Sequence, residues 1–455
     1  MITFLIFAQA SQASEFDYQT SGTVVAIGDI NGDYVQLVSL LREIELIDVA
    51  TNWAGGNSHL VSLGNLVGYD GQKVIQLFMK LEGQAEKAGG RVHVLLGDAD
   101  YDALTNPSEM ASAQRSWLQD LPVIIKLNAR IYTYGGIAYS FVEQSLKSIN
   151  DHAHLQLLNA NKASTDAEAQ LPLDEHVIRY RGTAMCHPYA ESFNVERFLK
   201  RRQVSQIVIG HVVTDGRVLS RMNGLVVLLD TGMSEAGSAA VLVDPPGEEP
   251  YVHYLGRDNK ISISDEENSL AKNISGMTDL EVEELLRMSP VVKTEEIGAG
   301  ITNPWRVTQV FEGADHSALF KYVDTNPGIE SKKYYSPRRN DESDRYAYEV
   351  AAYKLDRMLN LQLVPTAVVA TVDGKEGVLQ DWVNHAINER DRLENDIAFD
   401  GPCARLERYR LRIVLDILIY NDDRNLTNIM WTKNDFMMMF IDHTRAFRSS
   451  TKRPK

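Results

Sequence analysis

The sequence predicts two α/β domains in one chain. Its 455 residues exceed what one hydrophobic core usually organises, and 44% hydrophobic with 24% charged residues is ordinary for a globular protein. From Thr23 onward, short β-rich runs alternate with stretches of helical periodicity, which is typical of a layered α/β domain. A Pro-rich break at 245–250 and an aperiodic polar stretch at 257–275 then separate this pattern from a second domain.

The elements of the first domain follow from its apolar pattern. Short runs rich in β-branched and aliphatic residues predict strands, and apolar residues spaced three or four apart predict helices. Strands are expected at 24–27, 59–63, 91–96, 124–127, 131–134, 207–209, 226–229 and 240–243, and helices at 34–44 and 72–88.

Four segments follow from these boundaries. A capping box formed by Thr278 and Glu281 predicts that a short helix starts within the connection between the domains. The predicted segments are an apolar signal peptide or arm at 1–21, a first domain at 22–256, a linker with a short helix at 257–292 and a second domain at 293–455.

The amino-terminal run leaves the compartment open. Residues 1–10 are apolar and end in Ala8-x-Ala10, the form of a signal-peptide cleavage site, but no basic residues precede the run. The protein is therefore expected to be cytoplasmic or, if this run belongs to a signal peptide, periplasmic or secreted. No stretch reaches the roughly 20 apolar residues of a membrane span, so none is expected.

Charge argues against a nucleic-acid partner. Of the net charge of −16, residues 291–455 contribute 24 basic and 25 acidic side chains, which leaves 22 basic and 37 acidic side chains before them. An acidic surface repels a phosphate backbone, and no stripe of Lys and Arg reverses this. Two cysteines are too few for a cysteine-based zinc site.

Five glycine-containing turns follow strands of the first domain. They are Gly28-Asp29-Ile30-Asn31-Gly32, Gly64-Asn65-Leu66-Val67, Gly97-Asp98-Ala99-Asp100, Tyr134-Gly135-Gly136 and Gly210-His211. Open α/β sheets place ligands at the carboxyl ends of their strands, so these loops are expected to meet in one site.

In this order and spacing the turns resemble those of the calcineurin-like phosphoprotein phosphatases, close to their Shewanella-like branch, over residues 22–255. The family's loops read Gly-Asp-x-His-Gly, Gly-Asp-x-x-Asp-Arg-Gly, Gly-Asn-His-Glu, His-Gly-Gly and Gly-His. The resemblance implies a layered β-sandwich whose loops hold two divalent metals with a shared aspartate. Such a pair generates a hydroxide and clamps the phosphate.

Most of the implied metal ligands are replaced in this chain. Asp29 and His211 persist, whereas Asn31, Asn65 and Tyr134 stand where the family has a histidine, the shared aspartate and another histidine. A two-ion clamp needs ligands that are missing here, so no two-metal centre is expected.

Two further motifs depart from the family. Asp98 stands at the position of an asparagine ligand, and Ala99 at that of the general-acid histidine. Gly68 and Tyr69 replace the Asp-Arg pair that grips phosphate. The first domain is therefore expected to be an inactive, vestigial phosphatase whose glycines persist because the turns need them. A single ion held weakly by Asp98 and His211 is the alternative.

The second domain begins with a glycine loop and a strand-end lysine. Gly298 and Gly300 would let backbone N–H groups approach phosphate oxygens, and Lys321 would hold phosphates as a point charge. Glu349 lies in a helical pattern at 346–359 with mostly apolar neighbours, which favours a partner such as Lys321 over a surface position.

A base and two metal ligands follow in the pattern at 411–447. An apolar helix leads into a loop with Asp423 and, five residues later, Asn428, and the next strand ends at Asp442. Phosphoryl transfer requires this set of groups.

The second domain resembles the atypical kinases, namely HipA-like toxins, phosphoinositide kinases and the secretory Golgi casein kinase family, over residues 293–447. The resemblance implies a bilobal protein-kinase-like fold that uses ATP with Mg²⁺ or Mn²⁺. One position departs, since Asn425 stands at the family's loop histidine. The implied roles are base for Asp423, metal ligands for Asn428 and Asp442, nucleotide clamp for Lys321 with Glu349, and phosphate loop for Gly298 and Gly300.

The leading hypothesis is an ATP-dependent phosphotransferase with an N-terminal pseudophosphatase domain that regulates it or binds its substrate. The alternatives are a residual metal-dependent phosphoesterase and a catalytically silent scaffold. The acceptor, whether protein, sugar or lipid, stays open, as does transfer of AMP in place of phosphate. The tract 331–339 is a docking or autophosphorylation loop or, better supported, a solvated insertion. The kinase-like domain is either truncated or has a minimal C-terminal lobe, because eight residues follow Phe447.

Overall fold

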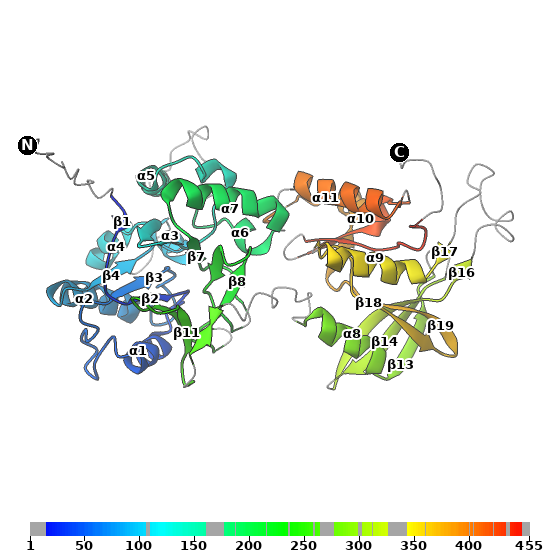
Figure 1. Cartoon of the computed structure of the whole chain (residues 1–455), viewed down its shortest axis with the longest axis horizontal. Coiled ribbons are helices and arrows are strands. Elements are labelled where there is room, and N and C mark those ends of the chain that lie inside the picture. The colour runs from blue at the N-terminus through cyan, green and yellow to red at the C-terminus, as the bar shows by residue number, and fades with distance from the viewer. Residues whose placement is uncertain are drawn as a thin grey trace, which may run out of the picture. The chain divides into compact units, whose positions relative to one another are not determined.

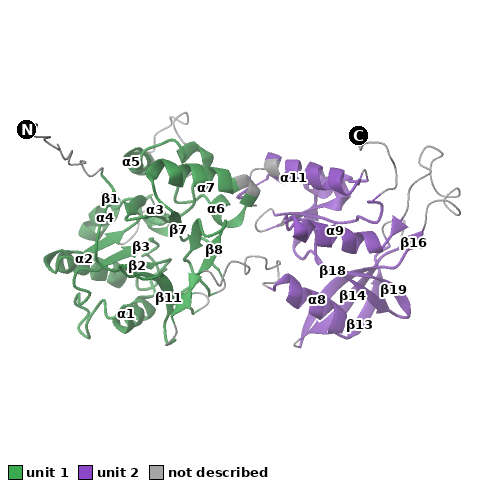
Figure 2. Ribbon diagram, viewed as in Figure 1, with its two compact units in different colours: residues 1–270 green, residues 271–455 purple. Residues whose placement is uncertain are grey.

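The chain folds into two compact units, residues 1–270 and 271–455 (Figure 2). The apolar run at 1–10, Gly300 and the tract 331–339 lie outside the described residues. No helix in the described ranges is long and apolar enough to cross a membrane. The computed structural model describes residues 15–105, 110–160, 177–186, 188–214, 216–234, 237–257, 260–263, 277–298, 303–311, 313–325, 344–359, 361–399, 401–403, 405–421, 423–433 and 437–447.

Two six-stranded sheets form the centre of the first unit (Figure 1). The first sheet has the order β1 (Asp17–Tyr18), β5 (Ile124–Leu127), β6 (Arg130–Thr133), β7 (Gln206–Ile209), β9 (Val226–Leu228) and β8 (Leu219–Arg221). The second has the order β12 (Ile261–Ser262), β11 (Tyr251–Tyr254), β10 (Ala240–Asp244), β2 (Val24–Ile27), β3 (His59–Ser62) and β4 (Arg91–Val94). Apolar side chains from both sheets, including Val61 and Val208, share one buried cluster. The unit is therefore a layered β-sandwich, as the sequence predicts.

Parallel pairing brings the glycine turns together. Strands β2, β3 and β4 pair in parallel, and so do β6, β7 and β9, with Ile27 opposite Ser62 and Thr133 opposite Ile209. The central positions of these strands are fully buried, as expected for parallel strands that are covered on both faces. Because parallel strands end at the same edge of their sheet, the turns that follow them lie next to one another.

Helices cover the sheets of the first unit through a larger apolar cluster. Observed helix bounds differ by one residue from the predicted ones in α1 (Tyr34–Glu43) and α2 (Gly71–Lys87). Asp33 starts α1, since its carboxylate accepts a hydrogen bond from the Gln36 backbone N–H at 3.0 Å. The helices without a sequence prediction are α3 (Asp98–Thr105), α4 (Ser112–Gln119), α5 (Leu146–Ala160), α6 (Gly182–Met185) and α7 (Pro188–Arg202).

The second unit combines a five-stranded antiparallel sheet with a mainly helical part (Figure 1). The sheet has the order β13 (Val291–Glu296), β14 (Trp305–Phe311), β15 (Ala314–Lys321), β19 (Lys375–Asp381) and β18 (Ala367–Val372). Helix α9 (Ala347–Met358) lies between this sheet and the other part. The remaining elements are β16 (Asp324–Thr325), β17 (Asp344–Arg345), β20 (Ala386–Asn388), α10 (Glu389–Glu394), α11 (Arg405–Leu418), β21 (Ile429–Thr432) and β22 (Met438–Phe440).

Helix α8 (Asp279–Met288), which the sequence places in the linker, packs into the second unit. The predicted capping box at Thr278 and Glu281 is present. Asp279 accepts a hydrogen bond from Arg357 Nε at 2.6 Å, and Glu283 accepts one from the Tyr353 hydroxyl at 2.9 Å. These contacts hold α8 against α9, the helix that carries Glu349.

Candidate functional site

Turns of the first unit bring together five of the seven residues of the predicted vestigial site. The Asp29 carboxylate accepts hydrogen bonds from the Tyr134 hydroxyl at 2.7 Å, the Asn65 amide at 3.1 Å and the His211 backbone N–H at 3.1 Å. His211 Nδ1 lies 3.6 Å from Asp98 Oδ2.

The other two positions contribute through their backbones. Asn31 donates its backbone N–H to the carbonyl oxygen of Asn65 at 2.7 Å, and Ala99 donates its own to Asn65 Oδ1 at 2.9 Å. Asn31, Asn65 and His211 all have φ between 50° and 67°. Asparagine tolerates this left-handed region better than most residues. The two asparagines therefore suit the left-handed geometry of these turns.

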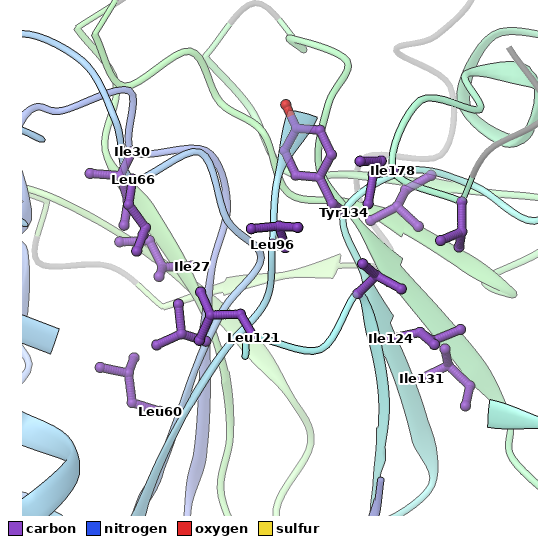
Figure 3. Packing of buried hydrophobic residues seen from close by; sticks show 14 of the residues in the cluster. Ile27, Ile30, Leu60, Leu66, Leu96, Leu121, Ile124, Ile131, Tyr134 and Ile178 are labelled. Carbon is purple, nitrogen blue, oxygen red and sulfur yellow. The ribbon is translucent and has the colours of Figure 1, made fainter. Parts of the chain in front are cut away.

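Tyr134 fills the centre of this site. Its hydroxyl hydrogen-bonds to Asp29 and also contacts the Asn65 amide, so it lies between two positions at which the resemblance implies metal ligands. Its ring is buried in the apolar cluster, and the hydroxyl points away from the surrounding aliphatic side chains (Figure 3). All three side chains are at most 6% exposed. Their polar atoms form hydrogen bonds with one another inside the protein.

Burial and neighbouring carboxylates shift the pKa values of two groups in this site. Burial, and then the neighbouring Asp230, raise the pKa of Asp29 well above its usual range. Burial and the carboxylates of Asp29 and Asp98 raise the pKa of Tyr134, so the phenol stays a neutral donor. Within the described part of the chain, no three His, Cys, Asp or Glu side chains cluster in a way that could hold a metal ion. The residues present do not fit a two-metal centre.

Glycines and Asp100 hold the turns together. A Cβ atom at Gly64 would lie 2.4 Å from the backbone nitrogen of Gly97, and one at Gly68 would lie 2.1 Å from the Asn31 carbonyl oxygen. The Asp100 carboxylate accepts hydrogen bonds from the backbone N–H groups of Leu66, Val67 and Gly97. The close approach of the turns explains why these positions are glycine.

A cavity of about 540 Å³ in the second unit is lined by most of the residues predicted for the kinase-like site. This volume is in the range of small-molecule sites. Glu349 lies behind Lys321 and is fully buried, and Gly298 follows the lining residue Ile297. The predicted residues on the cavity wall are Lys321, Asp423, Asn428 and Asp442, and apolar side chains beside them include Leu319, Val383, Met430 and Ile441.

The predicted pair of Lys321 and Glu349 is present. Lys321 Nζ lies 2.5 Å from Glu349 Oε1 and 2.8 Å from Asp442 Oδ1. Burial opposes the charge on Lys321, but Asp442 and Glu349 together raise its pKa above the usual value. Lys321, in turn, holds the pKa of Asp442 below its usual range. The site therefore keeps one cation between two carboxylates.

His443 supports this pair from the protein interior. Its Nδ1 lies 3.0 Å from Glu349 Oε2, and its Nε2 lies 2.8 Å from an Arg424 guanidinium nitrogen. Burial lowers the pKa of His443, so the ring is neutral and its Nδ1–H donates to Glu349 while Nε2 accepts from Arg424. Arg424 also donates to the carbonyl oxygens of Ile441 at 2.6 Å and Asn428 at 3.1 Å. These bonds fix the backbone on both sides of the site.

The loop that carries Asp423 is held by short-range bonds. Its backbone N–H donates to Asn421 Oδ1 at 3.2 Å, and its carbonyl oxygen accepts from Asn428 Nδ2 at 3.4 Å. Asn425, which departs from the resembling family, caps the next turn by accepting the Thr427 N–H at 2.9 Å. Asn425 therefore stabilises the turn that ends at Asn428.

Sequence reasoning missed three charged residues of this cavity, namely Asp344, Asp381 and Arg445. Arg445 Nη1 donates to Asp423 Oδ2 at 2.8 Å, and Asp344 accepts from Arg445. Arg445 follows the strand-end Asp442 by three residues, and this proximity was a usable signal. Asp344 lies 101 residues before Arg445 and offered none.

Comparisons with known proteins assign the first unit to a fold family. The family model described as Calcineurin-like phosphoesterase matches residues 22–215. Shewanella-like protein phosphatase 1 of Plasmodium berghei (strain Anka) is 27% identical over 270 residues, which cover 52% of this chain and 72% of that protein. The first unit therefore carries a calcineurin-like metallophosphatase domain with Shewanella-like phosphatases among its relatives, as the sequence predicts.

Solved structures give two further likenesses. A cold-active protein-tyrosine phosphatase of a psychrophilic Shewanella species is 24% identical, with 54% of this chain and 83% of that chain covered and a TM-score of 0.47. A weaker likeness, over the C-terminal part, is to the Golgi casein kinase, at 17% identity, 40% and 58% coverage and a TM-score of 0.28.

Proposed function

We propose that the second unit is an ATP-dependent phosphotransferase that uses Mg²⁺ or Mn²⁺, and that the first unit is a pseudophosphatase that regulates it or binds its substrate. The observation that carries the first part is the cavity that unites Lys321, Asp423, Asn428 and Asp442, although up to 121 residues separate them in sequence. Catalysis of phosphoryl transfer depends mainly on positioning and charge neutralisation, and this set supplies both.

The residues on the cavity wall fit a divalent cation bound together with ATP. Asn428 and Asp442 provide an amide and a carboxylate oxygen, and Mg²⁺ is commonly held by one or two protein ligands plus substrate phosphates. The cation, when bound, neutralises charge on the phosphates. Lys321 would hold the phosphates as a point charge, and Glu349 keeps its ammonium group in place.

Asp423 is placed to act on the acceptor. Its side chain is 29% exposed, lines the cavity and has one carboxylate oxygen bound by Arg445. Within the described residues, no hydrogen bond reaches its other oxygen, Oδ1. This oxygen would orient the acceptor hydroxyl and accept its proton.

The proposal for the first unit rests on Tyr134. Its hydroxyl and the Asn65 amide both donate hydrogen bonds to the Asp29 carboxylate, which a metal ion would otherwise need as a ligand. A buried set of polar groups that satisfy one another has little to offer a cation. The fold is kept, so a surface of the unit remains available for a regulatory or substrate-binding role.

Intact mass spectrometry tests the proposed reaction. The full-length chain is incubated with ATP and Mn²⁺, and a gain of one or more phosphates supports phosphotransfer. A gain of AMP would show that the reaction is adenylylation and not phosphotransfer. No gain, together with no ATP-dependent thermal shift, would favour the catalytically silent scaffold.

A residual phosphoesterase is the second candidate, because Asp98 and His211 still lie 3.6 Å apart. Hydrolysis of p-nitrophenyl phosphate by the full-length chain in the presence of Mn²⁺, lost in Asp98→Ala, would support it. We expect no metal-dependent hydrolysis above the Asp98→Ala background.

A further inference from the structure

We propose that Arg445 is a positioning residue for phosphotransfer, which fixes the carboxylate of Asp423 by tying it to the buried carboxylate of Asp344. This inference rests on the proposed function of the second unit, because it assigns a role toward the base of that reaction. Neither Arg445 nor Asp344 belongs to the set of residues that the sequence predicts.

The three side chains form a continuous bridge. Arg445 Nη1 donates to Asp423 Oδ2 at 2.8 Å, while Nε and Nη2 donate to Asp344 Oδ2 at 3.2 and 3.1 Å. The side chains of Asp344, Arg445 and Asp423 are 3%, 14% and 29% exposed, so exposure increases from the interior to the cavity. A guanidinium group is planar and its donors have a fixed geometry. The position of Asp344 therefore determines where Asp423 is held.

Asp344 is itself fixed at two levels. Its backbone belongs to β17, which pairs with β16 so that Asp344 is opposite Thr325. Its Oδ1 accepts a hydrogen bond from the Thr444 hydroxyl at 2.6 Å. The Thr444 hydroxyl oxygen also lies 3.2 Å from Asp442 Oδ1, so the anchor is adjacent to a proposed metal ligand. Asp344 is thus held within the site through both its backbone and its side chain.

The bridge assigns different roles to the two oxygens of Asp423. Oδ2 is occupied by Arg445, whereas Oδ1 is left for the acceptor. In the reaction, the acceptor oxygen forms a bond to the γ-phosphorus, the bond from that phosphorus to the β–γ bridging oxygen breaks, and ADP leaves. The acceptor proton passes to Asp423 Oδ1. Without Arg445 the carboxylate could tilt away from this orientation, and misplacement of a reacting group is costly.

The alternative is a purely structural ion pair. Exposed salt bridges contribute little to stability, whereas removing one partner of a mainly buried salt bridge destabilises the protein. Arg392 offers a matched control, because it forms a buried pair with Glu389 at 2.6 Å, both 5% exposed, and does not line the cavity. A structural role predicts the same behaviour for Arg445→Met and Arg392→Met.

Steady-state ADP formation by the full-length chain in Mn²⁺ separates the two roles. We expect Arg445→Met to lower kcat by about 100-fold, since the base loses its orientation. The KM for ATP should stay within about threefold, because the lost interaction acts on the transition state. Arg445→Lys should recover part of kcat, whereas Arg392→Met should lower Tm without lowering kcat of the folded fraction. An Arg445→Met kcat equal to wild type, or reduced only as far as the folded fraction is reduced, would overturn the inference.

A stability cycle provides a readout independent of activity. If Arg445 holds Asp423, the double variant Asp423→Asn with Arg445→Met should lose less Tm than the sum of the two single variants. Additive losses would overturn the bridge. If Arg445→Met does not fold, Asp344→Asn tests the same bridge, because it keeps the shape of the side chain. It should lower kcat by about tenfold, because it holds Arg445 less firmly. Unchanged kcat in Asp344→Asn would count against the bridge. If wild type forms neither ADP nor phosphorylated protein, the proposed function fails and this inference fails with it.

Discussion

In the first unit, the carboxylate of Asp29 is enclosed by the Tyr134 hydroxyl and the Asn65 amide, whereas in the second unit Asp423 and Asp442 line a cavity of about 540 Å³. Both centres lie in turns at strand ends or beside them, and both combine aspartate with asparagine. In the first, the polar groups bind one another. In the second, Lys321 and Arg445 pair with the carboxylates, and all four side chains line the cavity. The types of residue at a site are therefore less informative than which of their atoms remain available.

Removal of the proposed base or metal ligand should produce the largest difference between the units. We expect Asp423→Ala and Asp442→Ala each to reduce phosphate transfer by about 10³-fold or more, because positioning and charge neutralisation supply most of the catalysis. Only Asp442→Ala should also weaken metal-dependent ATP binding, measured by thermal shift. The double variant should be little worse than either single one.

The exposed Asp315, at the start of β15, provides the control for these variants. Asp315→Ala should transfer phosphate at the wild-type rate. If Asp423→Ala does so too, the second unit loses its proposed role and the contrast between the two units disappears.

Next in size is the buried ion pair of the second unit. Lys321→Met leaves Glu349, which is fully buried, without its main partner. Breaking one side of such a pair costs about 3–5 kcal/mol, so the urea midpoint of the second unit should fall accordingly. A matched double variant, Lys321→Met with Glu349→Leu, should regain part of this loss. Equal midpoints for wild type and Lys321→Met would contradict the buried pair.

A buried histidine, His93, should make the stability of the first unit depend on pH. Burial, and then the charges of His59 and Arg91, lower the pKa of His93 to about 3, so the folded first unit binds fewer protons than the unfolded chain. The free energy of unfolding is therefore unaffected by His93 above pH 6.5, and it falls as the pH is lowered from 6.5 toward 3, because the unfolded chain then binds a proton that the folded unit does not. Between pH 6.5 and 4, we expect a loss of about 2–3 kcal/mol of unfolding free energy that is absent in His93→Leu. Parallel curves for the two proteins by pH-dependent denaturation would refute this.

The smallest effect expected is a partial return of metal binding in the first unit. Reversion of the four positions to the family's pattern, Asn31→His, Asn65→Asp, Ala99→His and Tyr134→His, removes the tyrosine and restores anionic and imidazole ligands. We expect Mn²⁺ affinity to rise about tenfold or more, measured by calorimetry. Tyr134→Phe alone is the control, since it removes the hydroxyl without adding a ligand. If the Mn²⁺ affinity does not rise in the variant with all four substitutions, these turns do not correspond to the family's metal-binding loops.

Several features of both units were readable from local sequence. Strand β2 is a continuous apolar run, which reflects burial on both faces. The capping box of α8 uses residues three apart, and its geometry depends on these alone. Helices α3 and α7 escaped prediction because their apolar residues are few and tertiary packing stabilises them. Helix α5 was not predicted either, although its buried residues Leu146, Ile149, Ala153 and Leu157 have helical spacing.

By itself, the sequence determined the order of the glycine turns, and it predicted the partnership of Lys321 with Glu349, because both inferences depend on residue type at a known spacing. Only the tertiary structure decided that the Tyr134 hydroxyl binds Asp29, 105 residues away, and that Arg445 joins Asp423 to Asp344. Such contacts depend on which strands pair and where side chains find space in a close-packed interior. Periodicity along the chain carries no information about either.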